Sequence, residues 1–172
     1  MLVQGFKPIV DKDARVVILG TLPGRISLER QEYYADPKNA FWFIVQQLFG
    51  INEHASYGER VECLNNNRIA IWDVLERAER EGSSDNTIVE GTEVANNFAT
   101  FFRDYPSIED VFFNGGPAKK YFDRIPNLQT KGGTLRFNNP ALVSTSNATW
   151  GYTKANKVEN WRIVQLTVSG NS

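Results

Sequence analysis

The chain has 172 residues, a formal net charge of −1 and one cysteine, Cys63. A lone cysteine excludes an intramolecular disulfide and a thiolate metal cluster, and 41% hydrophobic with 23% charged residues is the balance of an ordinary globular protein. We expect a single domain over residues 1–172 that buries a full core. The N-terminus lacks the apolar core of a signal peptide and no stretch could span a bilayer, so we expect a cytoplasmic monomer with no membrane partner.

Basic residues are unevenly distributed along the chain. Residues 115–165 contain eight lysines and arginines against two acidic residues, which leaves the rest of the chain acidic. A basic half of this kind is compatible with a surface that faces phosphates. It is equally compatible with solvated, lysine-rich helices, so charge alone leaves both interpretations open.

The first half of the chain alternates apolar runs with helical patterns. Residues 15–19 form a continuous apolar run before a glycine, which is typical of a strand buried on both faces. Apolar residues then recur at helical spacing over 41–49. Residues 68–74 predict a second core strand, and the composition of 75–80 predicts a helix.

The second half repeats this alternation. We expect a helix over 93–102, a third strand over 108–113, a helix over 115–122, a fourth strand over 141–144 and a last helix capped by Thr153. Strands that alternate with helices predict a parallel sheet covered on both sides. The predicted fold is therefore α/β, a three-layer α/β/α sandwich with a central, mostly parallel, four-stranded sheet.

A glycine-rich loop, Gly20-Thr21-Leu22-Pro23-Gly24, follows the first predicted strand. Two glycines around a proline give a rigid turn whose backbone a ligand can approach closely. The loop lacks the Gly-Lys-Ser/Thr ending of a phosphate loop and the Gly-x-Gly-x-x-Gly dinucleotide pattern. A tight turn between a strand and a helix, with no ligand, explains the same residues.

Two residues stand out between this loop and the first long helix. Tyr34 lies in a loop before Pro37, where a ring is hard to bury and is suited to stacking on another flat ring. Asn39 offers an amide donor and a carbonyl acceptor, which could hold a water molecule or a base edge. Capping of the following helix is an equally good interpretation of Asn39.

A second polar loop, residues 144–149, follows the last predicted strand. Its hydroxyl and backbone N–H groups are suited to holding phosphates. No Gly-x-Ser-x-Gly elbow marks a serine nucleophile, His54 has no catalytic partner, and no metal-ligand pattern appears, so we expect no metal and no cofactor. Because the carboxyl ends of parallel strands meet at one edge, the two loops should face each other across a crevice.

Together, these loops resemble those of the uracil-DNA glycosylase superfamily. The Gly-x-x-Pro-Gly loop followed by Tyr34, Asn39, Phe41 and Trp42 is similar to the mismatch-specific uracil- and thymine-DNA glycosylases. The DNA-deoxyinosine (hypoxanthine-DNA) glycosylase branch is closer still, since it shares the Tyr33-Tyr34 pair, the Asn39-Ala40-Phe41-Trp42 run and similar segments at 71–74 and 144–146. The chain departs from the mismatch-specific pattern at Leu22, because the mismatch-specific enzymes carry a catalytic asparagine at that place. The deoxyinosine branch, like this chain, lacks that asparagine. Asp36, Val143 and Asn147 replace a histidine and two prolines that relatives usually have.

The resemblance implies a DNA repair enzyme that hydrolyses the N-glycosidic bond of a deaminated base, hypoxanthine above all, after the nucleotide has been flipped out of the duplex. It implies a catalytic role for Asn39, in positioning water or bonding the base. The residues that it implies for base binding are Gly20, Thr21, Leu22, Pro23, Gly24, Tyr34 and Ser144. Those implied for DNA binding are Ser146, Asn147, Ala148, Thr149, Lys154 and Lys157.

Three other functions are compatible with the same residues. One is a uracil or G·T/U mismatch-specific glycosylase with little action on hypoxanthine. The second is a non-catalytic module of the same fold that binds DNA or a protein partner, which Leu22, Asp36 and the acidic overall charge would suit. The third is an unrelated flavodoxin-like domain that binds a small phosphorylated ligand in the same crevice.

Overall fold

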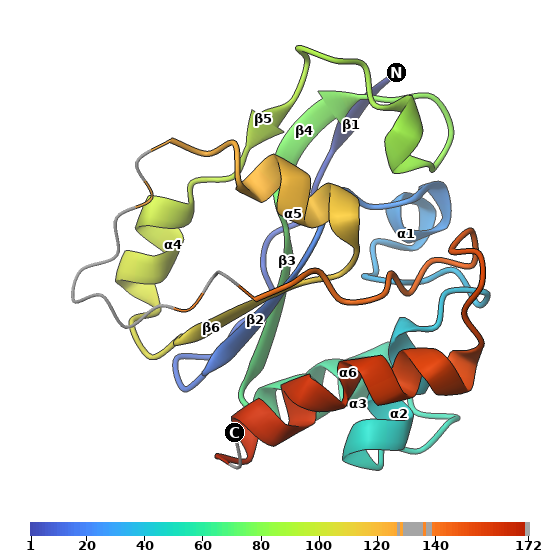
Figure 1. The fold of residues 1–172 in the computed structure, drawn as a ribbon, viewed down its shortest axis with the longest axis vertical. Helices are drawn as coiled ribbons and strands as arrows, with labels where there is room; N and C mark the ends of the chain where they lie inside the picture. Colours follow the sequence, from blue (N-terminus) through green and yellow to red (C-terminus); the bar gives the residue numbers. More distant parts are fainter. Residues whose placement is uncertain (127, 129–135, 137–138, 171–172) are drawn as a thin grey trace.

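The computed structural model describes residues 1–126, 128, 136 and 139–170 (Figure 1). Its centre is a parallel sheet with the strand order β3-β2-β6, formed by β2 (Val16–Gly20), β3 (Ile69–Asp73) and β6 (Asp110–Phe113). Every residue of these strands is buried, as the continuous apolar runs predict. The carboxyl ends of β2 and β3 coincide, because Gly20 is the register partner of Asp73.

A second, antiparallel sheet has the order β1-β4-β5, from β1 (Leu2–Gln4), β4 (Leu75–Glu79) and β5 (Val94–Ala95). The helix predicted over 75–80 is therefore wrong. A register irregularity between Leu75 and Arg77 places Leu75 and Ala78 on the buried side, three residues apart. That spacing imitates the period of a helix, whereas a regular strand buries every second residue.

Two further expectations need correction. Residues 93–102 do not form one helix, because Val94 and Ala95 belong to β5 and helix α4 (Phe98–Asp104) begins later. Residues 141–144 form no strand; Leu142 makes only an isolated parallel bridge with Asn114 at the end of β6. Within the described residues the parallel sheet has three strands, not the predicted four. The coarser prediction of an α/β fold with a parallel central sheet is confirmed.

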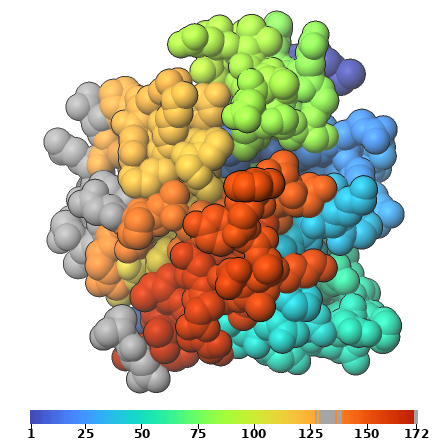
Figure 2. Space-filling view, turned by 45° about the vertical axis from the view of Figure 1, so that its right-hand side comes forward, coloured from blue at the N-terminus to red at the C-terminus, as the bar shows by residue number. Residues whose placement is uncertain are grey.

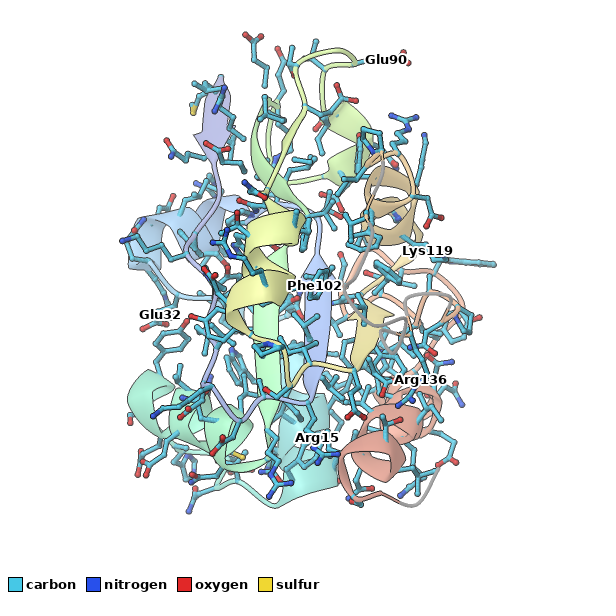
Figure 3. The ribbon with its side chains drawn as sticks, turned by 90° about the vertical axis from the view of Figure 1, so that its left-hand side faces the viewer. Arg15, Glu32, Glu90, Phe102, Lys119 and Arg136 are labelled. Carbon is cyan, nitrogen blue, oxygen red and sulfur yellow. The ribbon has the colours of Figure 1, made fainter. Side chains whose placement is uncertain are left out.

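Helices cover both faces of this sheet (Figure 1). Helices α4 and α5 (Gly116–Phe122) lie on one face, where Phe98 and Phe101 of α4 pack on Trp72 of β3. Figure 3 shows α4, with Phe102 labelled, in front of the strands. On the other face lie α2 (Phe41–Phe49) and α6 (Lys154–Val168), which pack on each other. The remaining helices are α1 (Arg25–Arg30), α3 (Tyr57–Asn66) and a 3-10 turn, η1 (Asp85–Thr87).

The predicted end of α2 and the predicted start of α6 are both confirmed. Gly50, with φ 74°, ends α2, and the Thr153 side chain accepts a hydrogen bond from the backbone N–H of Asn156 to cap α6. Phe41 of α2 meets Trp161 of α6 edge to face, with the ring centroids 5.9 Å apart. None of the helices in the described ranges combines the length and apolar character that crossing a bilayer requires.

Candidate active site

A cleft of about 530 Å³ opens at the carboxyl ends of β2 and β3. Its walls come from segments far apart in the sequence: the glycine-rich loop, the loop before α2, the turn around η1 and the loop before α6. Figure 2 shows these segments meeting on one face, with the second loop in orange-red beside the blue, cyan and green segments. The lining includes every predicted base-binding residue, Asn39 and four predicted DNA-binding residues, namely Gly20, Thr21, Leu22, Pro23, Gly24, Tyr34, Ser144, Asn39, Ser146, Asn147, Ala148 and Thr149. The predicted crevice between the two loops is therefore present.

Gly20 lines this cleft where the Asp73 and Tyr34 side chains approach the backbone closely. A Cβ atom there would come within 2.5 Å of Asp73 Oδ1 and 3.1 Å of Tyr34 Oη. The first distance is far below a normal contact, so a larger residue at this position would displace the strand end, the carboxyl group or the ring. The glycine brings backbone, carboxyl and phenol together at one point.

The glycine-rich loop is held from below by a buried arginine that sequence reasoning missed. Arg80 is 1% exposed and donates to the backbone carbonyls of Leu22 (3.4 Å) and Pro23. Its guanidinium lies 3.7 Å from Asp85, which also lines the cleft. An arginine at the end of the helix predicted over 75–80 gave no sequence signal for this role, since its burial depends on the strand β4 that precedes it.

Tyr34 presents an aromatic ring to the cleft. Its backbone has φ 54°, a conformation that non-glycine residues rarely adopt, and its ring stacks on Phe41 with centroids 3.9 Å apart and an interplanar angle of 17°. Phe41 covers one face of the ring, so a ligand in the cleft would stack on the other. Burial raises the pKa of the Tyr34 hydroxyl, which therefore remains neutral.

The Asn39 amide uses its oxygen within the chain and leaves its nitrogen without a partner among the described residues. Its Oδ1 accepts a hydrogen bond from the Phe41 backbone N–H at 2.9 Å, which fixes the chain at the start of α2. That bond assigns the two amide atoms, because Nδ2 could not accept it. Nδ2 makes no hydrogen bond to the part of the chain that the structure describes, so it is available as a donor in the cleft.

The second loop is fixed by bonds that begin outside it. The Asn114 amide bonds both the backbone N–H and the hydroxyl of Thr145, each at 2.9 Å. Trp161 Nε1 of α6 donates to the Val143 carbonyl at 2.8 Å, and the Ala40 N–H donates to the Thr145 carbonyl at 2.9 Å. The last bond ties the second loop to the residue beside Asn39.

The two predicted phosphate-binding lysines lie outside the cleft lining. Lys157 is 4% exposed and donates to the Ser146 carbonyl at 2.7 Å, so a buried tether, not a free cation, occupies that position. Burial lowers the pKa of its ammonium group. Lys154 is exposed at the start of α6, with its Nζ 5.1 Å from the Phe43 ring centroid.

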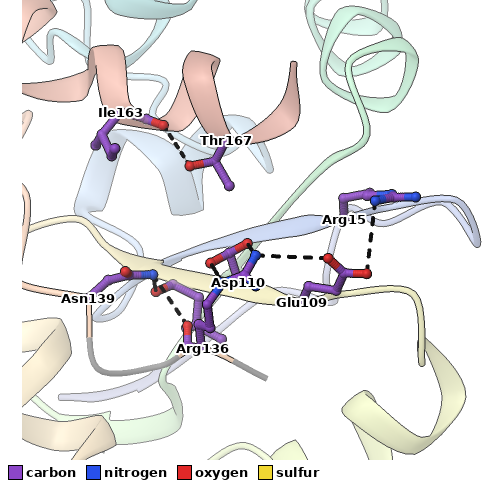
Figure 4. Close-up of polar contacts among 8 residues, drawn as sticks. Arg15, Glu109, Asp110, Arg136, Asn139, Ile163 and Thr167 are labelled. Carbon is purple, nitrogen blue, oxygen red and sulfur yellow. Dashed lines mark hydrogen bonds and ion pairs between the residues drawn. The ribbon is translucent and has the colours of Figure 1, made fainter. Parts of the chain in front are cut away.

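Four of the eight basic residues in residues 115–165 form ion pairs with carboxylates, two of which, Asp110 and Glu93, lie outside that region. Figure 4 shows Arg136 against Asp110, next to the Arg15–Glu109 pair. Similar pairs join Lys119 to Asp123, Arg124 to Glu93 and Arg162 to Glu159. Lys131 lies outside the described residues. Phosphate binding would therefore depend mainly on hydroxyl and N–H groups, with few unpaired cations.

Sequence reasoning also missed an acidic side of the cleft. Asp36, Asp73 and Asp85 all line it. Asp73 is 4% exposed; its burial, reinforced by Asp85 and opposed by Arg80, raises the pKa of this carboxyl to about 7. Its sequence signals were an acidic residue at the end of an apolar run and its place in the segment 71–74 that resembles the deoxyinosine branch, and neither assigned it a role. No group of three or more histidine, cysteine or acidic residues in the described ranges is arranged to hold a metal ion.

Trp150 is a third feature that the sequence did not reveal. It follows the cleft-lining residues Asn147, Ala148 and Thr149, and its side chain is 95% exposed. Exposure of a whole indole at the edge of a cleft is unusual for a globular protein, because tryptophan is normally largely buried.

Comparisons with known proteins agree with the sequence resemblance. The family model described as "Uracil DNA glycosylase superfamily" matches residues 7–165. A *Methanosarcina acetivorans* protein named hypoxanthine DNA glycosylase is 33% identical over 165 residues, which cover 95% of this chain and 98% of that protein. A *Methanosarcina barkeri* protein of the same name is 34% identical over 146 residues, covering 84% and 87%.

A solved structure also matches over nearly the whole chain. It is the solution NMR structure of a candidate uracil DNA glycosylase from *Methanosarcina acetivorans*, with a TM-score of 0.80, 30% identity and coverage of 98% of this chain and 99% of that one. The two proteins therefore share the same fold. The chain belongs to the uracil DNA glycosylase superfamily.

Proposed function

We propose that this protein is a DNA glycosylase that removes hypoxanthine from deoxyinosine in DNA by hydrolysis of the N-glycosidic bond. Two relatives named hypoxanthine DNA glycosylase, aligned over most of the chain, support the substrate. The observation that carries the proposal is the pairing, in one cleft, of the Tyr34 ring with an uncommitted amide donor on Asn39. A flat ring and a single donor suit a flat heterocycle with acceptor atoms at its edge.

The base must leave the duplex before it can enter this cleft. Tyr34, supported from behind by Phe41, stacks on the flipped base, and the backbone of residues 20–24 lines its edge. The glycosidic bond breaks toward an oxocarbenium-like sugar while the base departs as an anion, so stabilisation of developing charge lowers the barrier. Asn39 Nδ2 donates either to the leaving base or to the oxygen of the attacking water. This route requires no cofactor, and we expect it to operate in a cytoplasmic monomer.

The second loop can hold the DNA backbone through its hydroxyl groups. Ser144 Oγ accepts from the Ser146 N–H and Ser146 Oγ accepts from the Ala148 N–H, each at 3.2 Å. Because each hydroxyl acts as acceptor within the loop, its O–H remains free to donate to a phosphate oxygen. Asn147, Ala148 and Thr149 face the cleft and fill the space that the base vacates, Lys154 supplies charge, and Lys157 acts through the Ser146 carbonyl.

Uracil is the second candidate substrate, since the solved relative is described as a candidate uracil DNA glycosylase. Duplexes containing a single deoxyinosine, deoxyuridine, deoxyxanthosine or G·T mismatch separate the candidates by base release followed by alkaline strand cleavage. The proposal predicts the fastest release from deoxyinosine. Release of uracil alone would assign the protein to the uracil-specific group, and binding of every duplex without release would make it a non-catalytic module.

Asn39→Ala tests the named residue. We expect it to keep DNA binding and lose at least about 100-fold in single-turnover rate, in the range of other lost transition-state donors. Asn52→Ala is the matched control, because Asn52 Oδ1 makes the same kind of bond, to the His54 N–H at 2.8 Å, in an exposed loop. Near wild-type turnover in Asn39→Ala would remove Asn39 from the mechanism.

A further inference from the structure

Two buried oxygen atoms near Gly20 make no hydrogen bond within the described part of the chain. Tyr34 Oη and Asp73 Oδ2 are inaccessible to solvent and make no hydrogen bond with the described part of the chain. Both side chains line the cleft and both flank Gly20. The Asn114 amide lies beside the Tyr34 hydroxyl; its Oδ1 and one of its two N–H groups are bonded to Thr145, and the second N–H can donate to that hydroxyl. Buried polar atoms are almost always paired, so the unpaired Asp73 oxygen, on a side chain that lines the cleft, suggests that a ligand completes it.

Charged and titratable groups surround Asp73 on three sides. Arg80, directly after β4, and Asp85 of η1 act on it electrostatically, as do Tyr33 and Tyr34 from the loop before α2. Burial and the Asp85 carboxylate favour the protonated form of Asp73, and Arg80 opposes them. The pKa of about 7 means that Asp73 carries its proton below neutral pH and loses it above.

We propose that Asp73 binds the N1–H/O6 edge of the flipped base as a neutral carboxylic acid. A carboxylic acid places an O–H donor beside a C=O acceptor, and hypoxanthine places an O6 acceptor beside an N1–H donor, so two hydrogen bonds form at once. A carboxylate offers acceptors only and would repel O6. The same N–H and C=O pair occurs in uracil and xanthine, so the inference extends the proposed function, on which it rests, to lactam-bearing bases as a class.

The neutral acid also contributes to bond cleavage. When the base leaves as an anion, part of the negative charge resides on O6, so a donor O–H to that atom bonds more strongly in the transition state than in the ground state. An ionised Asp73 would instead oppose the developing charge. Activity should therefore be present while Asp73 is protonated and fall as the pH rises past its pKa.

The pH profile of single-turnover release from a deoxyinosine duplex tests this inference. The wild type should lose about tenfold in rate for each pH unit above about 7. Asp73→Asn keeps one donor and one acceptor at every pH, so it should remain active and lack this alkaline loss. Asp36→Asn, which alters another acid of the same cleft, should retain it, and Asp85→Asn should move it to lower pH because Asp85 raises the pKa of Asp73. An unchanged alkaline loss in Asp73→Asn would overturn the inference.

Two further measurements keep this result separate from the proposed function. In the wild type, N1-methyldeoxyinosine should be released at least tenfold more slowly than deoxyinosine, whereas Asp73→Ala should treat the two alike; equal rates in the wild type would contradict edge binding. The pKa of Asp73 is about 7 in the folded state and 3.8 when unperturbed, so between these values the folded state binds more protons than the unfolded state. The Tm of the wild type should therefore fall as the pH rises toward 7, and Asp73→Asn should reduce that fall. Failure of the proposed function would appear instead as no base release by the wild type at any pH.

Discussion

Replacement of Gly20 by alanine isolates the close approach on which the site depends. The added Cβ would lie 2.5 Å from Asp73 Oδ1 and 3.1 Å from Tyr34 Oη, so the carboxyl or the strand end must move by close to 1 Å to restore a normal contact. Overpacking of this kind costs roughly 1–3 kcal/mol of unfolding free energy, and a displacement of about 1 Å at reacting groups costs on the order of 100-fold in rate. We therefore expect Gly20→Ala to fold with a Tm several degrees lower and to lose most of its activity.

Thermal unfolding and single-turnover release from a deoxyinosine duplex measure the two effects. Gly24→Ala in the same loop is the control for stability, because its Cβ would meet Ser83 only at 3.7 Å and the backbone φ of −73° accepts alanine. Gly58→Ala in α3, where the added Cβ would meet only Ser56 Oγ at 4.0 Å, is the control for activity. A Gly20→Ala protein with wild-type rate, or a Gly24→Ala protein equally destabilised, would refute the steric reasoning.

Two other substitutions test the second loop. Lys157→Met keeps the apolar stem but removes the 2.7 Å bond to the Ser146 carbonyl, a charge-assisted bond of about 1.5–3 kcal/mol. Tm should therefore fall by several degrees, and the KM for the duplex should rise more than kcat falls. An unchanged Tm would show that this bond does not stabilise the loop. Trp150→Ala removes an exposed side chain, so Tm should stay constant while affinity for the deoxyinosine duplex, measured by fluorescence anisotropy, drops roughly tenfold through lost stacking on bases. Unaltered affinity would exclude Trp150 from the DNA interface.

The sequence predicts the framework of the fold well, because fully buried parallel strands appear as continuous apolar runs. Val16–Gly20 and Ile69–Asp73 follow this rule, and the capping residue Thr153 marks the start of α6. Prediction failed where geometry is irregular. The irregular register of β4 gives a strand the spacing of a helix, and residues 141–144 are apolar like a strand but make one bridge only.

The site was predictable where loop chemistry is local and unpredictable where it depends on packing. The crevice residues from Gly20 to Gly24, with Tyr34 and Asn39, lie together because the strand ends coincide. The burial of Lys157 depends on how α6 packs against the second loop, which the residue type does not reveal. The state of Asp73 likewise depends on neighbours from β4, η1 and the loop before α2.

The most direct test of the central claim is a crystal structure with a duplex that carries a non-hydrolysable 2′-fluoro analogue of deoxyinosine. We predict a flipped hypoxanthine stacked on the Tyr34 ring, with Asn39 Nδ2 and the Asp73 carboxyl within hydrogen-bonding distance of its edge atoms. A base that stays in the helical stack, or that occupies the neighbouring hollow lined by Glu93, Lys120 and Arg124, would contradict it.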